Sequence, residues 1–524
     1  MAGTGNEGRR SRITQRVAVS AGAYSLAFSL MAGCPGVVWV AGQSPTTAIA
    51  DKRQFMVLSE DRTHLVNTFT NKPVFITGDT AYNLITQLTS DADVEAYLAD
   101  RQAKGINLIW VALVDFGSHG EGTHPPGEGP GEGNTQKDAF GNDPWNGAAD
   151  FTGMEGATAY WTHVDDVLKR AAAHGITVLA GTAFAGTFSS CKLPYFSSMV
   201  TSSDATMKAY GAFLGNRYKS YPNVIWLQGG DANIKTCGSD LGKKVNDLAQ
   251  GILSADPVHL MAVEATSGVW GEASTTHWSS YTFGPDNPAG WLTLGTIYPK
   301  GTPDKVFSAE IDQIISQSAT ETEARPFVPY FSVEDPYEYE PWSREPYDDQ
   351  QLRQVAYSEV LSGAKLGRLF GSAGVWPFGA PCCQHGSKWQ VNMEHPASFD
   401  QQRLGQLFRS REHWKLIADT HHTVVTAGFG ADETLTVTSR TADGQTIIAY
   451  VPKGNRTTLT VDMSKVTSKL HQATCWWFSP SSGATSLIGS FVTLGKRNFT
   501  PPTAIDWVLV IDDTAAKLPA PGDS

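Results

Sequence analysis

Short apolar runs alternate with longer amphipathic stretches over most of the chain. The runs are almost continuously apolar, which is typical of strands buried on both faces of a parallel sheet. They lie at 74–79, 108–114, 177–184, 224–231, 259–265, 291–298, 327–334 and 366–373. Helix-like stretches lie at 91–104, 160–174, 204–220, 241–254, 303–317, 348–363 and 400–412. Eight strands with interleaved helices predict an α/β fold, a closed (β/α)8 TIM barrel, although no clear helix separates the fifth and sixth strands.

The pattern changes after about residue 415. Segments 433–439, 445–451, 457–462, 472–478, 490–493 and 506–511 are short, rich in β-branched and aromatic residues, and separated by turn sequences. They predict a small antiparallel β-sandwich. We therefore expect an export segment and linker over 1–50, a catalytic barrel over 51–414 and an all-β domain over 415–524. The last domain is expected to pack on the barrel, and carbohydrate or partner binding is its alternative role.

The N-terminus resembles an export signal. Arg9, Arg10 and Arg12 precede a mostly apolar stretch over 17–32, and small residues follow. Two interpretations stay open, a lipid anchor on Cys34 and simple cleavage near Ala50. We expect an exported protein, extracellular or periplasmic.

Composition limits the class of partner. The 524 residues carry a net charge of −12, with 18% charged and 10% aromatic residues. A negative chain without a basic patch argues against nucleic-acid binding. Few charges and many aromatics favour an uncharged ligand such as an oligo- or polysaccharide. The sequence has no zinc-type Cys/His spacing, P-loop or dinucleotide fingerprint, and we expect no metal or organic cofactor. Oligomeric state is left open.

The six cysteines fit an oxidising compartment only loosely. Cys191 and Cys237 lie in loops after two successive strand candidates, so they could pair. The alternative is that all are reduced and packed, since no spacing forces pairing.

Two carboxylates stand where an apolar run gives way to a polar loop. Asp231 closes Val-Ile-Trp-Leu-Gln-Gly-Gly-Asp (224–231), and Glu334 closes Phe-Val-Pro-Tyr-Phe-Ser-Val-Glu (327–334). Barrel active sites are assembled from such strand ends. Asp231 is the candidate general acid/base, with a helix cap as the alternative role. Glu334 is the candidate nucleophile, with a solvated acidic loop as the alternative and Glu338 as its competitor.

Further candidates surround this pair. Asp79, at the end of the first strand, is expected to accept hydrogen bonds from a sugar hydroxyl pair or to cap the next helix. Tyr298 is a candidate to steady the nucleophile, and Tyr337 or Glu338 is a candidate to support it through hydrogen bonds. Tyr298, Tyr337 and Glu338 are also candidate substrate contacts, and Trp376 is a candidate to stack on a sugar face. Glu264, at the end of the fifth strand, receives no role. The Gly- and Pro-rich stretch 116–150 is expected to be a long loop on the catalytic face, either functional or a flexible insertion.

A carboxyl pair of this kind suits glycosidic cleavage, which needs one protonated and one ionised group. By strand count, Asp231 and Glu334 end the fourth and seventh strands. A separation of about 5–5.5 Å would give retention of configuration, and one above roughly 6.5 Å would give inversion. The alternative function is a non-catalytic carbohydrate-binding or adhesion protein on a retained barrel, which would have no need of the pair.

At these residues the chain resembles the apiosidase-like glycoside hydrolases, over roughly 53–512. The resemblance is carried by Pro-Val-Phe-Ile-Thr-Gly-Asp-Thr-Ala-Tyr (73–82), Pro-Asn-Val-Ile-Trp-Leu-Gln-Gly-Gly-Asp (222–231), Val-Glu-Asp-Pro-Tyr-Glu (333–338) and Gly-Val-Trp-Pro-Phe (374–378). The C-terminal part is similar to the small domain labelled collagen-binding in this family, through Trp-Trp-Phe-Ser-Pro-Ser-Ser-Gly (476–483) and 501–510.

The resemblance implies a (β/α)8 hydrolase whose catalytic residues fall on Asp231 and Glu334. Apiose release from pectic side chains is the activity attached to the family. The chain departs from the family pattern at the sixth strand and over 116–150, so the sugar stays open. Collagen binding does not follow from the label.

Overall fold

The computed structural model describes residues 54–114, 137–145, 150–185, 195–230, 239–264, 290–299, 307–324, 327–340, 346–379 and 388–523. The predicted export segment, Asp231 and the stretch 115–136 lie outside these residues. Of the six cysteines, only Cys475 is described, and it is buried with a free thiol. None of the described helices combines the length and apolar character needed to cross a bilayer.

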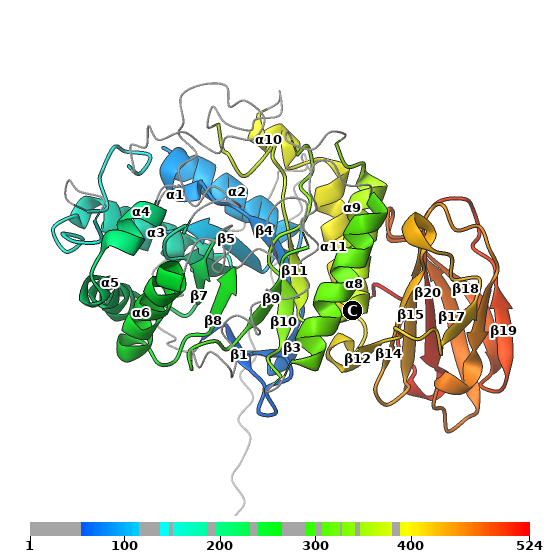
Figure 1. The fold of residues 1–524 in the computed structure, drawn as a ribbon. Coiled ribbons are helices and arrows are strands. Elements are labelled where there is room, and N and C mark those ends of the chain that lie inside the picture. Colours follow the sequence, from blue (N-terminus) through cyan, green and yellow to red (C-terminus); the bar gives the residue numbers. More distant parts are fainter. Residues whose placement is uncertain are drawn as a thin grey trace, which may run out of the picture. The chain divides into compact units, whose positions relative to one another are not determined.

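Eight parallel strands form the sheet at the centre of the N-terminal part (Figure 1). They are β4 (Ile76–Thr80), β5 (Leu108–Ala112), β6 (Thr177–Gly181), β7 (Val224–Gly229), β8 (Met261–Glu264), β9 (Gly295–Ile297), β10 (Tyr330–Ser332) and β11 (Gly367–Phe370). Their order is β8-β7-β6-β5-β4-β11-β10-β9. A parallel bridge between Ala262 and Leu294 brings the two edge strands together, so the barrel is nearly closed. The predicted eight strands are all present, each shorter than its apolar run.

Every strand of this sheet is buried along its whole length. Alternate residues serve different cores, as the two-residue period of a strand requires. Trp110 packs in a cluster made only of strand and loop residues, which fills the barrel, whereas Ile109 and Val111 pack in a second cluster with the surrounding helices. A small antiparallel sheet of β1 (Met56–Leu58), β2 (Leu65–Asn67) and β3 (Lys72–Val74) precedes the barrel, and its Leu65 joins the inner cluster.

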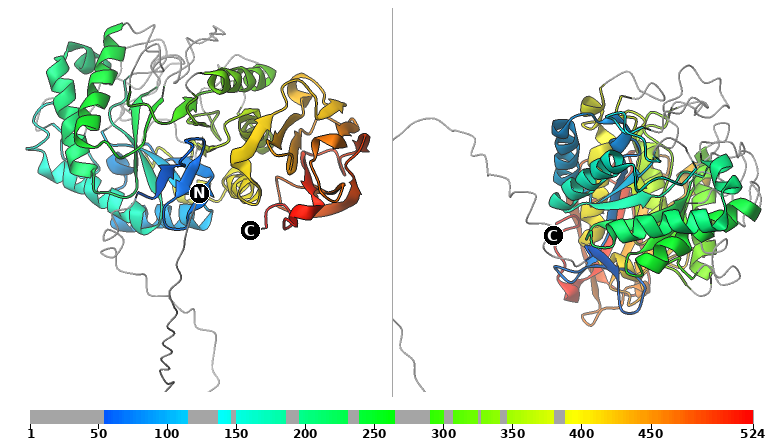
Figure 2. Two further views of the ribbon diagram at one scale, coloured as in Figure 1. Left: turned by 90° about the horizontal axis from the view of Figure 1, so that it is seen from below. Right: turned by 90° about the vertical axis from the view of Figure 1, so that its left-hand side faces the viewer.

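The helices cover the outside of the barrel (Figure 2). They are α1 (Leu84–Gln87), α2 (Asp91–Ala103), α3 (Thr158–Ala173), α4 (Phe196–Thr201), α5 (Asp204–Tyr218), α6 (Ser239–Ala255), α8 (Phe307–Glu323), α9 (Asp349–Ser362), α10 (Trp389–Asn392) and α11 (Pro396–Arg409). Some of them begin at a residue whose side chain caps the helix. Ser90 caps α2, and Asp348 forms a capping box with Gln351 at the start of α9.

Antiparallel strands make up the C-terminal part. They are β12 (Leu416–Ala418), β13 (Val425–Ala427), β14 (Val437–Thr441), β15 (Thr446–Val451), β16 (Leu459–Asp462), β17 (Gln472–Phe478), β18 (Thr485–Val492), β19 (Lys496–Phe499) and β20 (Trp507–Asp513). A six-stranded sheet, β12-β14-β15-β20-β17-β18, faces a three-stranded sheet, β13-β16-β19, across a shared apolar core. This is the predicted sandwich.

The six-stranded sheet is buried on its second face as well. Ile448, Tyr450 and Val510 pack in one cluster with Tyr357 of α9 and Phe408 of α11. Figure 1 shows α9 and α11 lying between the barrel strands and this sheet. The sandwich and the barrel therefore share an apolar core.

Candidate active site

Glu334 lies just beyond β10, the seventh strand of the barrel, with only 4% of its surface exposed. Its Oε1 accepts a hydrogen bond from the Tyr337 hydroxyl at 2.5 Å. Tyr337 belongs to the cluster that fills the barrel, so Glu334 is held at the barrel mouth. This is the position that the sequence predicts for the nucleophile.

The two competing acids near Glu334 face elsewhere. Asp335 forms a buried ion pair with Arg368. Glu338 accepts a hydrogen bond from Ser372 at 2.8 Å and is 2% exposed. Burial raises the pKa of Glu338 to about 8, so its carboxyl is mostly protonated at neutral pH. Neither is placed to act as an ionised nucleophile in the barrel mouth, and the expected contact of Glu338 with substrate does not match its position.

The fourth strand, β7, ends in two glycines directly before Asp231. Gly229 and Gly230 have φ values of 90° and 136°, which disfavour any other residue. A Cβ on Gly229 would lie 2.2 Å from the carbonyl oxygen of Glu264, and one on Gly230 would lie 2.9 Å from the Phe184 ring. Asp231 itself lies outside the described residues, so its distance from Glu334 stays a prediction.

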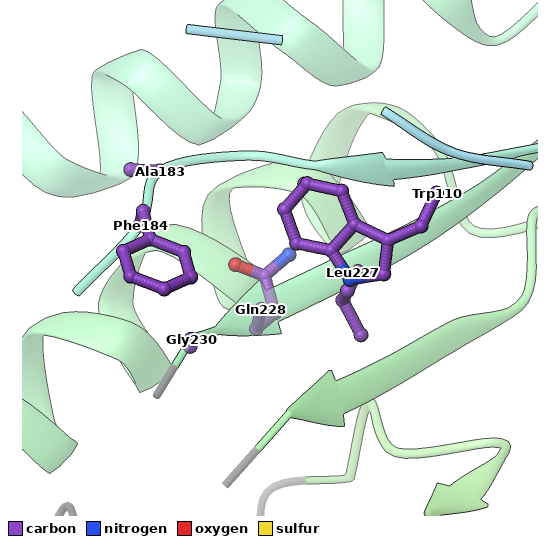
Figure 3. Close-up of a pocket in the computed structure, with 8 residues that line it drawn as sticks. Trp110, Ala183, Phe184, Leu227, Gln228 and Gly230 are labelled. Carbon is purple, nitrogen blue, oxygen red and sulfur yellow. The ribbon is translucent and has the colours of Figure 1, made fainter. Parts of the chain in front are cut away.

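A small hollow opens at this end of β7. It is lined by Trp110, Gly181, Ala183, Phe184, Leu227, Gln228, Gly229 and Gly230. Figure 3 shows the rings of Trp110 and Phe184 on either side of the Gln228 side chain. Gly230, the last described residue before Asp231 in the sequence, lines this hollow.

Glu264 provides a further carboxylate inside the barrel mouth. It ends β8, is 1% exposed, and accepts a hydrogen bond from the Trp110 indole at 2.8 Å. Trp110 fits because Gly181 faces it from the next strand, where a Cβ would lie 2.6 Å from the indole ring. The sequence pattern predicts no role for Glu264 and does not mark Trp110 as a site residue. The alternation of inward and outward residues along β5 would have identified Trp110 as inward-facing.

Asp79 faces away from the barrel mouth, contrary to the prediction from its place at a strand end. Along β4, Ile76 faces the barrel interior, and a Cβ on Gly78 would meet the interior residue Leu369, whereas Asp79 faces out toward α2. There it accepts a hydrogen bond from Tyr97 at 2.8 Å and pairs with Arg101 at 3.2 Å. Because all three side chains are buried, Asp79 fastens α2 to the barrel and cannot reach a sugar hydroxyl.

Tyr298 and Trp376 join the aromatic cluster of the barrel interior. The backbone of Tyr298 is held by Gln317, at 2.8 Å on its N–H and 2.9 Å on its carbonyl. The ring of Trp376 lies 5.5 Å from that of Tyr82 and 6.4 Å from that of Tyr337. Trp376 is 4% exposed, so it supports the tyrosines around Glu334 and has little surface left for a sugar face.

Within the predicted long loop, the described residues 137–145 are held to α3. Asp138 accepts hydrogen bonds from Asn142 and lies 3.2 Å from the His163 ring nitrogen. The chain over 146–149 is not described.

Comparison with known proteins agrees with this architecture. Residues 59–415 match the model of the family described as "Apiosidase-like, catalytic domain". The chain belongs to the apiosidase-like family, and is thus a glycoside hydrolase. Residues 421–512 match the model described as "Putative collagen-binding domain of a collagenase".

Two solved structures share the fold of this family member. A glycoside hydrolase family 5 protein from Bacteroides vulgatus is 22% identical, with a TM-score of 0.69, covering 88% of this chain and 93% of that one. A second structure, described as a glycoside hydrolase, is 20% identical, with a TM-score of 0.67, covering 88% and 97%. The predicted barrel with C-terminal antiparallel sheets is confirmed. The search of curated proteins found no match.

Proposed function

We propose that this enzyme cleaves a glycosidic bond in a plant or microbial polysaccharide with retention of configuration, with Glu334 as nucleophile and Asp231 as general acid/base. The observation that carries the proposal is the hydrogen bond from Tyr337 to Glu334 at the barrel mouth. A hydroxyl donor stabilises the ionised carboxylate that a nucleophile requires. The family supports a furanose such as apiose as the sugar released.

In the proposed mechanism, Glu334 attacks the anomeric carbon while Asp231 protonates the departing oxygen, and a covalent glycosyl-enzyme forms. Asp231 then removes a proton from water, which releases the sugar and restores Glu334. The interior tyrosines and Trp376 pack around the hydrogen bond between Tyr337 and Glu334.

The test is hydrolysis of pectic, arabinan and bacterial glycans by wild type, Glu334→Gln and Asp231→Asn. Both variants should lose at least about a hundredfold in rate, the low end for a general acid or base. Glu60→Gln is the control, because Glu60 is an exposed carboxylate in the turn between β1 and β2. Full activity of either site variant would refute the roles assigned here.

Azide rescue separates the two roles. Azide added to Glu334→Ala should give a glycosyl azide of inverted configuration, because azide replaces the missing nucleophile. Azide added to Asp231→Ala should give the retained azide, because it attacks the glycosyl-enzyme. If the wild-type enzyme releases a sugar of inverted configuration, water attacks the anomeric carbon directly and the mechanism is inverting.

We also propose export, supported by the arginines and apolar stretch of residues 9–32. Intact-mass measurement of protein recovered from outside the cytoplasm should show loss of the N-terminal segment. A chain that still begins at Met1 would refute cleavage, and an added acyl mass at Cys34 would identify the lipid anchor.

A further inference from the structure

Three side chains from two distant parts of the chain form a line of hydrogen bonds at the barrel mouth. The hydroxyls of Tyr82 and Tyr337 lie 2.6 Å apart, and Tyr337 continues to Glu334 at 2.5 Å. Tyr82 follows β4, the first strand, whereas Tyr337 and Glu334 follow β10, the seventh. The contact between the two tyrosines therefore joins the segments after these two strands.

The direction of these hydrogen bonds follows from the number of protons. An ionised carboxylate only accepts, and a tyrosine hydroxyl has one proton to donate. If Tyr337 donates that proton to Glu334, its oxygen must accept the proton of Tyr82. Burial and the nearby Glu334 raise the pKa of Tyr337 well above its usual value, so its hydroxyl stays protonated. Among the described residues, the titratable groups that act on Tyr337 include Glu334, Tyr82 and Tyr298.

The rings of the two tyrosines are fixed by their neighbours. Tyr82 packs edge-on against Trp110, with ring centroids 4.6 Å apart, and against Trp376 at 5.5 Å. Trp110 in turn donates to Glu264 across the barrel. Tyr82 is 7% exposed and Tyr337 is 2% exposed, so neither hydroxyl is surrounded by bulk water that would replace a lost partner.

From this geometry we infer that Tyr82 is a positioning residue for the reaction, acting on Glu334 only through Tyr337. The inference rests on the proposed role of Glu334 as nucleophile. By donating to the Tyr337 oxygen, Tyr82 orients the Tyr337 hydroxyl toward Glu334 and strengthens it as a donor, since linked hydrogen bonds polarise one another. Tyr82 thereby favours the ionised form of Glu334 and fixes the oxygen that does not attack.

A double-mutant cycle tests this, with Tyr82→Phe, Tyr337→Phe and the double variant assayed on the cleaved glycan and on 4-nitrophenyl furanosides. Tyr337→Phe should lose about tenfold to a hundredfold in kcat/KM, as expected for a hydrogen bond to a charged group. Tyr82→Phe should lose about twofold to tenfold, as expected for a neutral one. The double variant should match Tyr337→Phe within about twofold, because Tyr82 has no effect without Tyr337.

The pH profile of kcat/KM is the second measurement, because a purely structural role for Tyr82 would leave this profile unchanged. Its acidic limb should shift to higher pH in both single variants, because ionised Glu334 loses stabilisation. Tyr357→Phe is the matched control, since Tyr357 is a buried tyrosine between α9 and the C-terminal sheet. It should leave both rate and profile unchanged.

The outcomes separate this inference from the proposed function. If Glu334→Gln is fully active, the proposed function itself fails. If Glu334→Gln is inactive but Tyr82→Phe lowers kcat/KM by the same factor in the wild type and in Tyr337→Phe, Tyr82 acts independently of Tyr337. That result would overturn the inference. An unshifted acidic limb in Tyr82→Phe would overturn it as well.

Discussion

Gly371 leaves the space in which the Tyr337 ring lies. A Cβ at this position would stand 1.9 Å from Cδ1 and 2.1 Å from Cε1 of that ring, closer than any real contact. The φ angle of Gly371 lies outside the left-handed region, so alanine suits the backbone, and the ring is the main obstruction, with the Thr80 hydroxyl 3.2 Å from the added Cβ. Gly371 is thus required by the position of Tyr337 and not by a turn.

We expect Gly371→Ala to lose at least as much kcat/KM as Tyr337→Phe, about tenfold or more, because the ring and its hydroxyl are both displaced from Glu334. Steady-state assays beside thermal unfolding check this. Gly454→Ala is the control, because its Cβ would meet only the methyl end of Thr434 in the C-terminal part. Wild-type activity in Gly371→Ala would mean that Tyr337 is not needed where the structure has it.

At the scale of single residues, the same strand-end pattern selected Glu334, which lies just past β10, and Asp79, which faces away from the barrel mouth. Both carboxylates close an apolar run, and the sequence does not show which way a side chain at a strand end faces. Only the register of β4 against its neighbours shows that Asp79 faces α2. The ion pair with Arg101 also could not be predicted, because the two residues come together only when α2 packs on the strand.

At the scale of elements, Glu338 joins the segment after β10 to the segment after β11. Its backbone N–H donates to the Gly371 carbonyl at 3.0 Å, its carbonyl accepts from Ala373 at 2.9 Å, and its carboxyl accepts from Ser372. These contacts prolong the pairing of the two strands past their carboxyl ends. Tyr337, next to Glu338 in the chain, is held in place with them.

Because burial raises the pKa of Glu338 from 4.5 to about 8, this residue makes stability depend on pH. Below pH 4.5 its carboxyl is protonated in both folded and unfolded chains. As pH rises toward 8, the unfolded chain ionises first, so stability is lost over this window. Arg101, which opposes the rise, and Asp79 and Asp349, which add to it, are the charges acting on Glu338.

Glu338→Gln removes that dependence while keeping the size of the side chain. Between pH 5 and pH 8 we expect wild type to lose on the order of 1–3 kcal/mol more of its free energy of unfolding than the variant, since one pKa unit corresponds to about 1.4 kcal/mol. Urea unfolding at a series of pH values measures the difference, with Glu60→Gln expected to follow wild type. Parallel curves for wild type and Glu338→Gln would contradict the prediction.

The elements themselves were predictable to different degrees. Continuous apolar runs identified all eight barrel strands, yet residues such as Leu113 and Phe184 lie past the last paired residue, buried without being in a strand. The strands β1, β2 and β3 were missed because three residues are too few to display a period. In the C-terminal part, β19 (Lys-Arg-Asn-Phe) carries mostly exposed polar residues, so its sequence lacks the apolar signal of a strand.

At the scale of the whole molecule, two ion pairs join the segment after α11 to the C-terminal sheet. Arg411 contacts Asp512 of β20 through two hydrogen bonds, at 3.0 and 2.8 Å, and both side chains are buried. Lys415 contacts Asp443 at 2.8 Å, but both are partly exposed, at 35% and 42%. The two pairs span the same junction but differ in burial, and of the two only the buried Arg411–Asp512 pair is bidentate.

That difference predicts unequal effects on stability. Asp512→Asn should lower the free energy of unfolding by about 3 kcal/mol, because Arg411 would remain buried without a counter-charge. Asp443→Asn should cost less than about 1 kcal/mol, as water already screens Lys415. Because the six-stranded sheet shares an apolar core with α9 and α11, the loss in Asp512→Asn should appear in barrel and sandwich together. Urea unfolding followed by tryptophan fluorescence and by loss of activity measures this, and a sandwich that unfolds in Asp512→Asn while activity persists would show that the two parts are stabilised separately.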